Sequence, residues 1–182
     1  LELTGPVTRH GGRTIRYCDP VGIHHSMTKL LLKRAAEIAP GVPRSQISLV
    51  IVGHGTSLNE NSTAAIKSQV ELIRHSDAGF AEVVDAYMEE EPLVAKWDEL
   101  TTAPNVVVVP FFIADGLHSY EDIPVLLGIS ESSPGAISAN QGEVFRRNPY
   151  ALRGRHLFYS AAIGTEELMA DVILDQVAAA PR

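Results

Sequence analysis

The stretch from Asn105 to Pro124, NVVVVPFFIADGLHSYEDIP, decides the fold that we predict for this chain. It opens with an apolar run from Val106 to Ile113 that only Pro110 interrupts. A run that is apolar on both faces and rich in β-branched residues is typical of a strand covered by helices on both sides. An Asp-Gly pair ends the run, and His118 follows it. Because ligands bind at the carboxyl ends of strands in parallel α/β sheets, His118 lies where a ligand-binding or catalytic residue is expected.

An earlier stretch repeats this arrangement. Residues Ile47 to Gly53, ISLVIVG, form another strand of the buried type, and His54 follows at once. A further strand is predicted from about Phe80 to Met88, and Glu89 comes directly after it. In a doubly wound sheet of this size, the strands that precede the two histidines are usually neighbours at the switch point. We therefore expect His54, His118 and Glu89 to meet at one edge of the sheet.

Strand-like and helical segments alternate along the chain, which predicts an α/β fold. Helical periods separate the strands, and a fourth strand, about Arg155 to Ile163, precedes a closing helix from Thr165 to Ala179. This order predicts a doubly wound, four-stranded parallel sheet of order 2-1-3-4 with helices on both faces. We expect residues 1–46 to form an N-terminal extension or interdomain segment with one helix. Residues 47–182 should form the α/β domain, with a long loop over 129–154.

Composition excludes several classes of protein. The chain has 182 residues, of which 22 are acidic and 15 are Lys or Arg, and the formal net charge of −7 argues against a nucleic-acid partner. No apolar stretch reaches the roughly 20 residues of a membrane span, and no secretory signal opens the chain. The single Cys18 excludes an intrachain disulfide and fits a reducing, cytoplasmic location. Because the chain begins with Leu1, we interpret it as a piece of something longer.

The residues at the predicted sheet edge are compatible with two kinds of chemistry. Two imidazoles and a carboxylate suit a divalent first-row metal such as Co²⁺, Ni²⁺, Zn²⁺ or Fe²⁺. The same groups suit proton abstraction, because imidazole exchanges protons near neutral pH. The residue types and their spacing leave both possibilities open.

A triplet near the start of the chain suggests a different class of enzyme. Arg9-His10-Gly11 is similar to the phospho-accepting triplet of histidine phosphatases. That triplet should end a buried strand, whereas Leu1 to Thr8, which contains Gly5-Pro6, makes a poor strand. We therefore disfavour this alternative and expect residues 1–23 to be irregular.

Three segments carry a resemblance to a known family. They are VGHGTSLN after the first strand, YMEEEP after the second and VVPFFIADGLHSYEDIP around the third. In order and spacing they resemble the signature segments of sirohydrochlorin cobaltochelatases and ferrochelatases, which are class II tetrapyrrole chelatases. The resemblance covers about residues 47 to 180, and the final AAIGTEELMADVIL is similar to the family's last strand and helix. Thr56 departs from the usual serine, and Ser57-Leu58-Asn59 lacks the basic residue that commonly follows.

The resemblance implies an enzyme of siroheme or cobalamin biosynthesis, which inserts a divalent metal, Co²⁺, Fe²⁺ or Ni²⁺, into a tetrapyrrole such as sirohydrochlorin without ATP. By motif match, His54 and His118 would hold the metal or accept pyrrole protons, and Glu89 would assist as a catalytic group and metal ligand. Class II chelatases have two lobes, so the implied partner is a second copy in a homodimer or a second lobe of a longer chain. The alternative is a non-catalytic tetrapyrrole- or metal-binding module, that is, a degenerate chelatase lobe.

Overall fold

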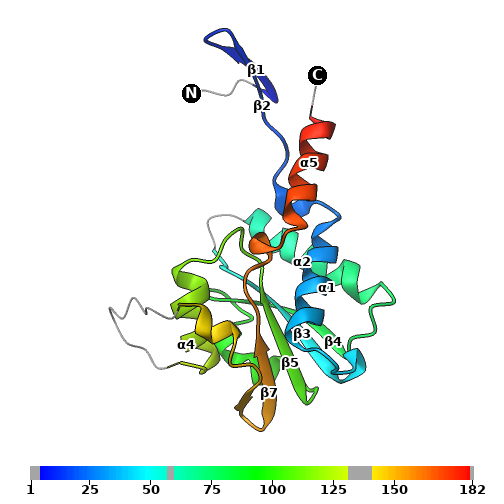
Figure 1. Ribbon diagram of the computed structural model, residues 1–182, viewed down its shortest axis with the longest axis vertical. Coiled ribbons are helices and arrows are strands. Elements are labelled where there is room, and N and C mark those ends of the chain that lie inside the picture. The colour runs from blue at the N-terminus through cyan, green and yellow to red at the C-terminus, as the bar shows by residue number, and fades with distance from the viewer. Residues whose placement is uncertain (1–4, 57–59, 131–140, 181–182) are drawn as a thin grey trace.

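A computed structural model shows the arrangement of the chain and describes residues 5–56, 60–130 and 141–180 (Figure 1). Its strands are β1 (Val7–His10), β2 (Arg13–Arg16), β3 (Ile47–Gly53), β4 (Glu82–Tyr87), β5 (Asn105–Pro110), β6 (Tyr150–Leu152) and β7 (Arg155–Tyr159). Its α-helices are α1 (Met27–Ile38), α2 (Glu60–Arg74), α3 (Trp97–Leu100), α4 (Ile123–Leu127) and α5 (Met169–Ala179). Short helical turns include η3 (Val94–Lys96), η4 (His118–Asp122) and η6 (Ile163–Thr165). Within the described ranges, no helix is both long and apolar enough to cross a membrane.

Five strands form the central sheet, in the order β4-β3-β5-β7-β6. The first four are parallel to their neighbours, and β6 pairs with β7 in the antiparallel sense. Along the chain, the four parallel strands come second, first, third and fourth, so the predicted order 2-1-3-4 is confirmed for them. The prediction of four strands in all is wrong, because β6 adds an antiparallel fifth strand. This order makes β3 the neighbour of both β4 and β5, and it brings the ends of these three strands to one edge.

Helices cover both faces of the sheet, as predicted. On one face, α1, α2 and α5 pack against a layer that includes Leu49, Ile51 and Val107. On the other face, α3 and α4 pack against a layer that includes Val50 and Val108. Successive residues of a strand point to opposite faces, and every residue of β3 and β5 is buried. Apart from the buried Ser48 and Asn105, both strands therefore lack polar residues, which is the pattern that the sequence shows.

The stretch 129–154 is not one continuous loop, and the prediction of a loop there is wrong for its second half. This half contains the helical turn η5 (Gln141–Phe145) and β6, while residues 131–140 lie outside the described part of the chain. β6 joins β7 through a two-residue turn in which Arg153 and Gly154 have φ angles of 47° and 75°. Positive φ at both positions matches the twist of a hairpin. Gly154 suits such an angle, but arginine rarely adopts it, so the sequence marks only one of the two turn positions.

Residues 1–23 were expected to be irregular, which is wrong for the hairpin of β1 and β2. Gly11 and Gly12 form its turn with φ angles of 57° and 74°, the conformation that a tight hairpin requires. The hairpin stands away from the central sheet, on the side toward which α5 projects (Figure 1). His10 is exposed on this separate ribbon rather than at the end of a buried strand. The histidine phosphatase interpretation is therefore wrong.

Two side chains of α1 bind Glu166, near the end of the chain. Its apolar face belongs to the core beneath the sheet. Lys33 donates a hydrogen bond to Glu166, and Arg34 Nε lies 3.5 Å from the second oxygen of the same carboxylate. The side chain of Glu166 is only 3% exposed, so these two cations are its main compensation for burial. The domain boundary expected after residues 1–46 remains a prediction.

We expect Glu166→Gln to lower the free energy of unfolding by about 1–2 kcal/mol at neutral pH. Burial by itself raises the pKa of Glu166, but the hydrogen bond from Lys33 and the charge of Arg34 hold it below its ordinary value of 4.5. A lowered pKa stabilises the fold above the ordinary pKa, and this stability is lost as pH falls through the folded-state pKa. The difference between wild type and variant should therefore shrink below about pH 4. Urea unfolding at several pH values measures this difference in unfolding free energy.

Glu167→Gln is the matched control, because Glu167 is the next residue and its side chain is exposed. We expect the control to unfold like the wild type at every pH. An equal loss of stability in both variants, or a difference that persists unchanged in acid, would contradict this role of Glu166.

Candidate functional site

Three strand ends meet at one edge of the sheet, and the predicted site residues lie there. His54 follows β3 directly, Glu89 follows β4 after one intervening residue, and His118 begins η4 beyond β5. The backbone amides of Met88 and Glu89 both donate to the carbonyl of His54, each over 3.1 Å. These bonds fasten the end of β4 to the end of β3, so the structure brings Glu89 beside His54.

The two histidine rings contact each other at this edge. Their centroids are 5.0 Å apart, and their planes meet at 75°. The side chain of His54 is 39% exposed and that of His118 is 46% exposed, so a ligand can reach both. Residues that are 64 positions apart in the sequence thus form one pair, as their places after neighbouring strands predict.

Hydrogen bonds determine which nitrogen of each ring carries the proton. Nδ1 of His54 lies 3.1 Å from the carbonyl oxygen of Gly55, and Nδ1 of His118 lies 2.6 Å from Oδ2 of Asp122. A carbonyl and a carboxylate only accept, so Nδ1 donates in both cases. A neutral imidazole has one ring proton, which leaves a lone pair on Nε2 of each histidine. That form can bind a metal or accept a proton.

Glu89 lies at the margin of the histidine pair. Its Oε2 is 3.7 Å from Nδ1 of His54, which is beyond hydrogen-bond distance, and its side chain is 61% exposed. In the described ranges of the chain, no group of three His, Cys, Asp or Glu side chains converges on a point that could hold a metal ion. The edge therefore offers two imidazole nitrogens with a nearby negative charge, and not the closed set of ligands of a structural metal site.

The turn after His54 is tightly packed, which limits where His54 can lie. Gly55 has a φ angle of 75°, and a Cβ there would come within 2.8 Å of Cβ of Tyr87 and 2.7 Å of Cγ of Glu90. Only glycine fits both the angle and the space. Glu90 is itself held by the hydroxyl of Thr63 in α2, which donates to it over 2.6 Å. The residue types after His54 thus serve to place its ring.

Apolar side chains border the histidines on the β5 side. The ring of Phe112 lies 6.0 Å from that of His118, measured between centroids. Ile113 and Leu117, which flank the turn between β5 and η4, each leave 62% of their surface exposed. Large exposed apolar side chains beside polar groups are typical of a surface that receives an apolar ligand.

Asp122 contacts the site, and the sequence interpretation used it only as part of a motif. The available signal is the spacing in HSYED, where Asp122 follows His118 by four residues. Residues at this spacing lie on the same side of a helical turn. The segment Ser57-Leu58-Asn59, which has no basic residue, lies outside the described residues.

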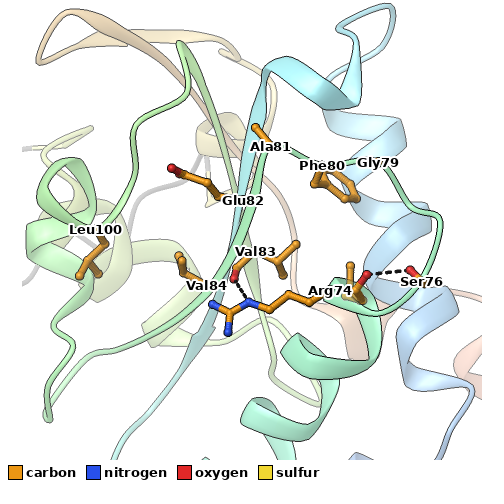
Figure 2. A pocket seen from close by; sticks show the side chains of 10 residues that line it. Arg74, Ser76, Gly79, Phe80, Ala81, Glu82, Val83, Val84 and Leu100 are labelled. Carbon is orange, nitrogen blue, oxygen red and sulfur yellow. Dashed lines mark hydrogen bonds between the residues drawn. The ribbon is translucent and has the colours of Figure 1, made fainter.

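A hollow elsewhere on the surface is not the candidate site. Figure 2 shows this hollow beside Glu82, Val83 and Val84 at the start of β4. Its volume is 490 Å³, and Glu89 follows the other end of the strand. Its polar groups already have partners, since Arg74 Nε donates to the carbonyl of Val83 over 2.8 Å and Glu82 accepts from Ser48 over 2.6 Å. No histidine or cysteine is among the residues that line it. Its lining offers no unpaired group that would act on a ligand.

Comparison with known proteins identifies the family. A family model described as CbiX matches residues 48–180. The chain belongs to the CbiX family. A probable sirohydrochlorin cobaltochelatase of Halobacterium salinarum is 37% identical over 167 residues, which make up 91% of this chain and 54% of that protein. A sirohydrochlorin cobaltochelatase of Methanosarcina acetivorans is 28% identical over 138 residues, which make up 72% of this chain and 95% of that protein.

This CbiX-family chain also shares its fold with solved structures. One is a CbiX described as the terminal enzyme for biosynthesis of siroheme in denitrifying bacteria, with a TM-score of 0.66 and 19% identity over 92% of this chain and 63% of that chain. At this identity the likeness concerns the fold. The chain spans about half the length of the Halobacterium relative and nearly all of the Methanosarcina relative. The family that three sequence segments indicated is confirmed.

Proposed function

We propose that this chain inserts a divalent metal into a tetrapyrrole such as sirohydrochlorin without ATP, and that His54 and His118 carry the reaction. The observation that supports this proposal most directly is the histidine pair, with rings 5.0 Å apart and with Nδ1 of each ring occupied by an acceptor. Relatives named sirohydrochlorin cobaltochelatase favour Co²⁺ and sirohydrochlorin as substrates. Fe²⁺ and Ni²⁺ are further candidates, because imidazole binds them as well.

The reaction requires that two pyrrole N–H protons leave while the metal enters. A neutral imidazole nitrogen can hold a metal or accept a proton, but it cannot do both at once. With two histidines, Nε2 of one ring can hold the ion while Nε2 of the other accepts the two pyrrole protons one after the other and passes each to solvent. Glu89 contributes a negative charge beside His54, which attracts a metal cation to this edge. Two protein ligands hold an ion less firmly than a closed site of four, which suits a metal that must be released to the macrocycle.

A partner is part of the proposal. A flat, largely apolar macrocycle would lie against the exposed Ile113 and Leu117 beside the histidines. Ligand sites usually bury most of their ligand, whereas this edge supplies one wall. We therefore propose that a second lobe of a longer chain, or a second copy in a homodimer, supplies the other wall. A strictly monomeric chain that inserted Co²⁺ as fast as a two-lobed relative would contradict this.

A cytoplasmic location is also proposed, supported by the free thiol of Cys18.

The test is a direct assay of metal insertion. Purified protein is mixed with sirohydrochlorin and Co²⁺ in the absence of ATP, and the change in the visible absorption of the macrocycle is followed. Acceleration over the protein-free rate would support the chelatase. Binding of sirohydrochlorin without any acceleration would favour the non-catalytic binding module instead.

We expect Glu89→Gln to reduce the rate of Co²⁺ insertion by no more than about fivefold, because exposed charge pairs contribute only about 0–1 kcal/mol. The carboxylate is 61% exposed and lies 3.7 Å from His54, so it assists without a direct hydrogen bond. Glu91→Gln is the control, since Glu91 pairs with Lys96 instead. A loss as large as that of a histidine variant would make Glu89 a principal ligand or base.

A further inference from the structure

We propose that Asp122 is a positioning residue, which keeps the proton of His118 on Nδ1 and leaves Nε2 available to the metal or to a pyrrole proton. This inference rests on the proposed metal insertion, in which His118 acts. It starts from the distance of 2.6 Å between Nδ1 of His118 and Oδ2 of Asp122. A hydrogen bond of this length to a carboxylate is of the strong, charge-assisted kind.

The backbone that carries both side chains is anchored in the core. η4 is a π-helical turn in which the amide of Ile123 donates to the carbonyl of His118. Ser119 and Ile123 are buried, and the hydroxyl of the buried Tyr159 donates to the carbonyl of Ser119 over 2.8 Å. Single π-helical turns occur frequently at functional sites. Although the side chains of His118 and Asp122 are about half exposed, they extend from a fixed backbone.

Another histidine in the chain shows how an ordinary surface pair differs. Glu71 in α2 and His75, which directly follows α2, have the same four-residue spacing, but Nδ1 of His75 is 3.6 Å from the carboxylate. Nδ1 of His75 donates instead to the backbone carbonyl of Glu71, 2.8 Å away, and the side chain of His75 is 80% exposed. Spacing alone therefore does not produce a direct bond to the carboxylate. The π-helical turn brings Asp122 into direct contact with His118.

The carboxylate affects the histidine in two ways. It accepts the Nδ1 proton, so the lone pair of the neutral ring stays on Nε2, and it restrains rotation of the ring. Among the described residues, Nδ1 of His54 donates to the neutral carbonyl of Gly55 at 3.1 Å and lies 3.7 Å from the carboxylate of Glu89, beyond hydrogen-bond distance. The two rings thus differ in their support, and the loss of Asp122 should affect His118 alone. Carboxylates that support a metal-binding histidine typically contribute 10–100-fold to activity or metal affinity.

Two variants, Asp122→Ala and Asp122→Asn, test the proposal. In Asp122→Ala, kcat for Co²⁺ insertion should fall about 10–100-fold. KM for sirohydrochlorin should change little, because Asp122 does not contribute to binding of the macrocycle. Asp122→Asn should retain more activity, since its amide oxygen can still accept the Nδ1 proton. Glu71→Ala is the matched control on the other histidine–carboxylate pair and should leave kcat unchanged.

A second measurement does not depend on activity. Nitrogen NMR of the metal-free protein with labelled histidine reports which ring nitrogen of His118 carries the proton, and the signal is assigned by its loss in His118→Ala. The wild type and Glu71→Ala should show the proton on Nδ1, and Asp122→Ala should show a population with the proton on Nε2. A wild-type rate in Asp122→Ala, or a lost rate with the proton still on Nδ1, would overturn the proposal. If the wild type inserts no metal, the proposed function fails, and the NMR result still decides whether Asp122 sets the tautomer.

Discussion

Replacement of His118 by alanine is expected to slow Co²⁺ insertion into sirohydrochlorin by roughly 10²–10⁴-fold, the usual contribution of a general base. His54→Ala should cause a loss of similar size. Each variant removes one of the two Nε2 lone pairs that the structure places together, with ring centroids 5.0 Å apart. The remaining histidine would have to hold the metal and accept protons in turn. The double variant should be little worse than either single one, because the two rings act as a unit.

The affinity for the macrocycle distinguishes a loss of catalysis from a loss of folding in these variants. Affinity for metal-free sirohydrochlorin should survive in both variants, since most of it would come from apolar contact and not from the imidazoles. His75→Ala is the control, because His75 is highly exposed just after α2 and lies beside Glu71. Visible absorption measures insertion, and fluorescence titration measures binding. Wild-type insertion rates in both histidine variants would remove the pair from the mechanism.

The central sheet could be predicted because its two inner strands are buried on both faces. The apolar residues of β3 and β5 point in turn into the two cores, so the runs ISLVIVG and NVVVVP are mostly apolar and do not alternate with polar residues. β6 could not be predicted, because its three residues are too few to show a period. Its turn also depends on a positive φ at Arg153, and nothing about arginine indicates such an angle. The glycine pair of the β1–β2 hairpin was a visible signal that the interpretation as irregular chain overlooked.

The histidine pair could be predicted for a different reason, which is topology. Once β3 and β5 are recognised as parallel neighbours, the residues that follow them must lie at the same edge. The contact between His118 and Asp122 could not be derived in this way. It is made on a π-helical turn, where the hydroxyl of Tyr159 donates to the carbonyl of Ser119, and these two residues are far apart in sequence. Spacing in the sequence suggests the pair, but tertiary contacts determine its geometry.

Gly164→Ala is expected to lower the free energy of unfolding by about 3 kcal/mol, at the upper end of the usual cost of overpacking. A Cβ on Gly164 would lie 1.9 Å from the carbonyl oxygen of Ile113 and 2.4 Å from its Cα. These are backbone atoms, so no side-chain rotation can relieve the clash. The amide of Gly164 also donates to the carbonyl of Phe112 over 2.9 Å, which holds η6 against the end of β5.

Gly164→Ala should also alter the geometry of the histidine site, because the segment at Ile113 that must move leads directly to η4. A displaced Ile113 would shift the turn before His118 and separate the two histidine rings, so Co²⁺ insertion should fall together with stability. Gly142→Ala is the matched control, since a Cβ there meets nothing within 4 Å. Urea unfolding measures stability, and the insertion assay is carried out well below the unfolding midpoint. If Gly164→Ala were as stable as Gly142→Ala, the close approach of η6 to β5 would not be required. A destabilised variant with the wild-type rate would show instead that the histidine pair does not depend on this contact.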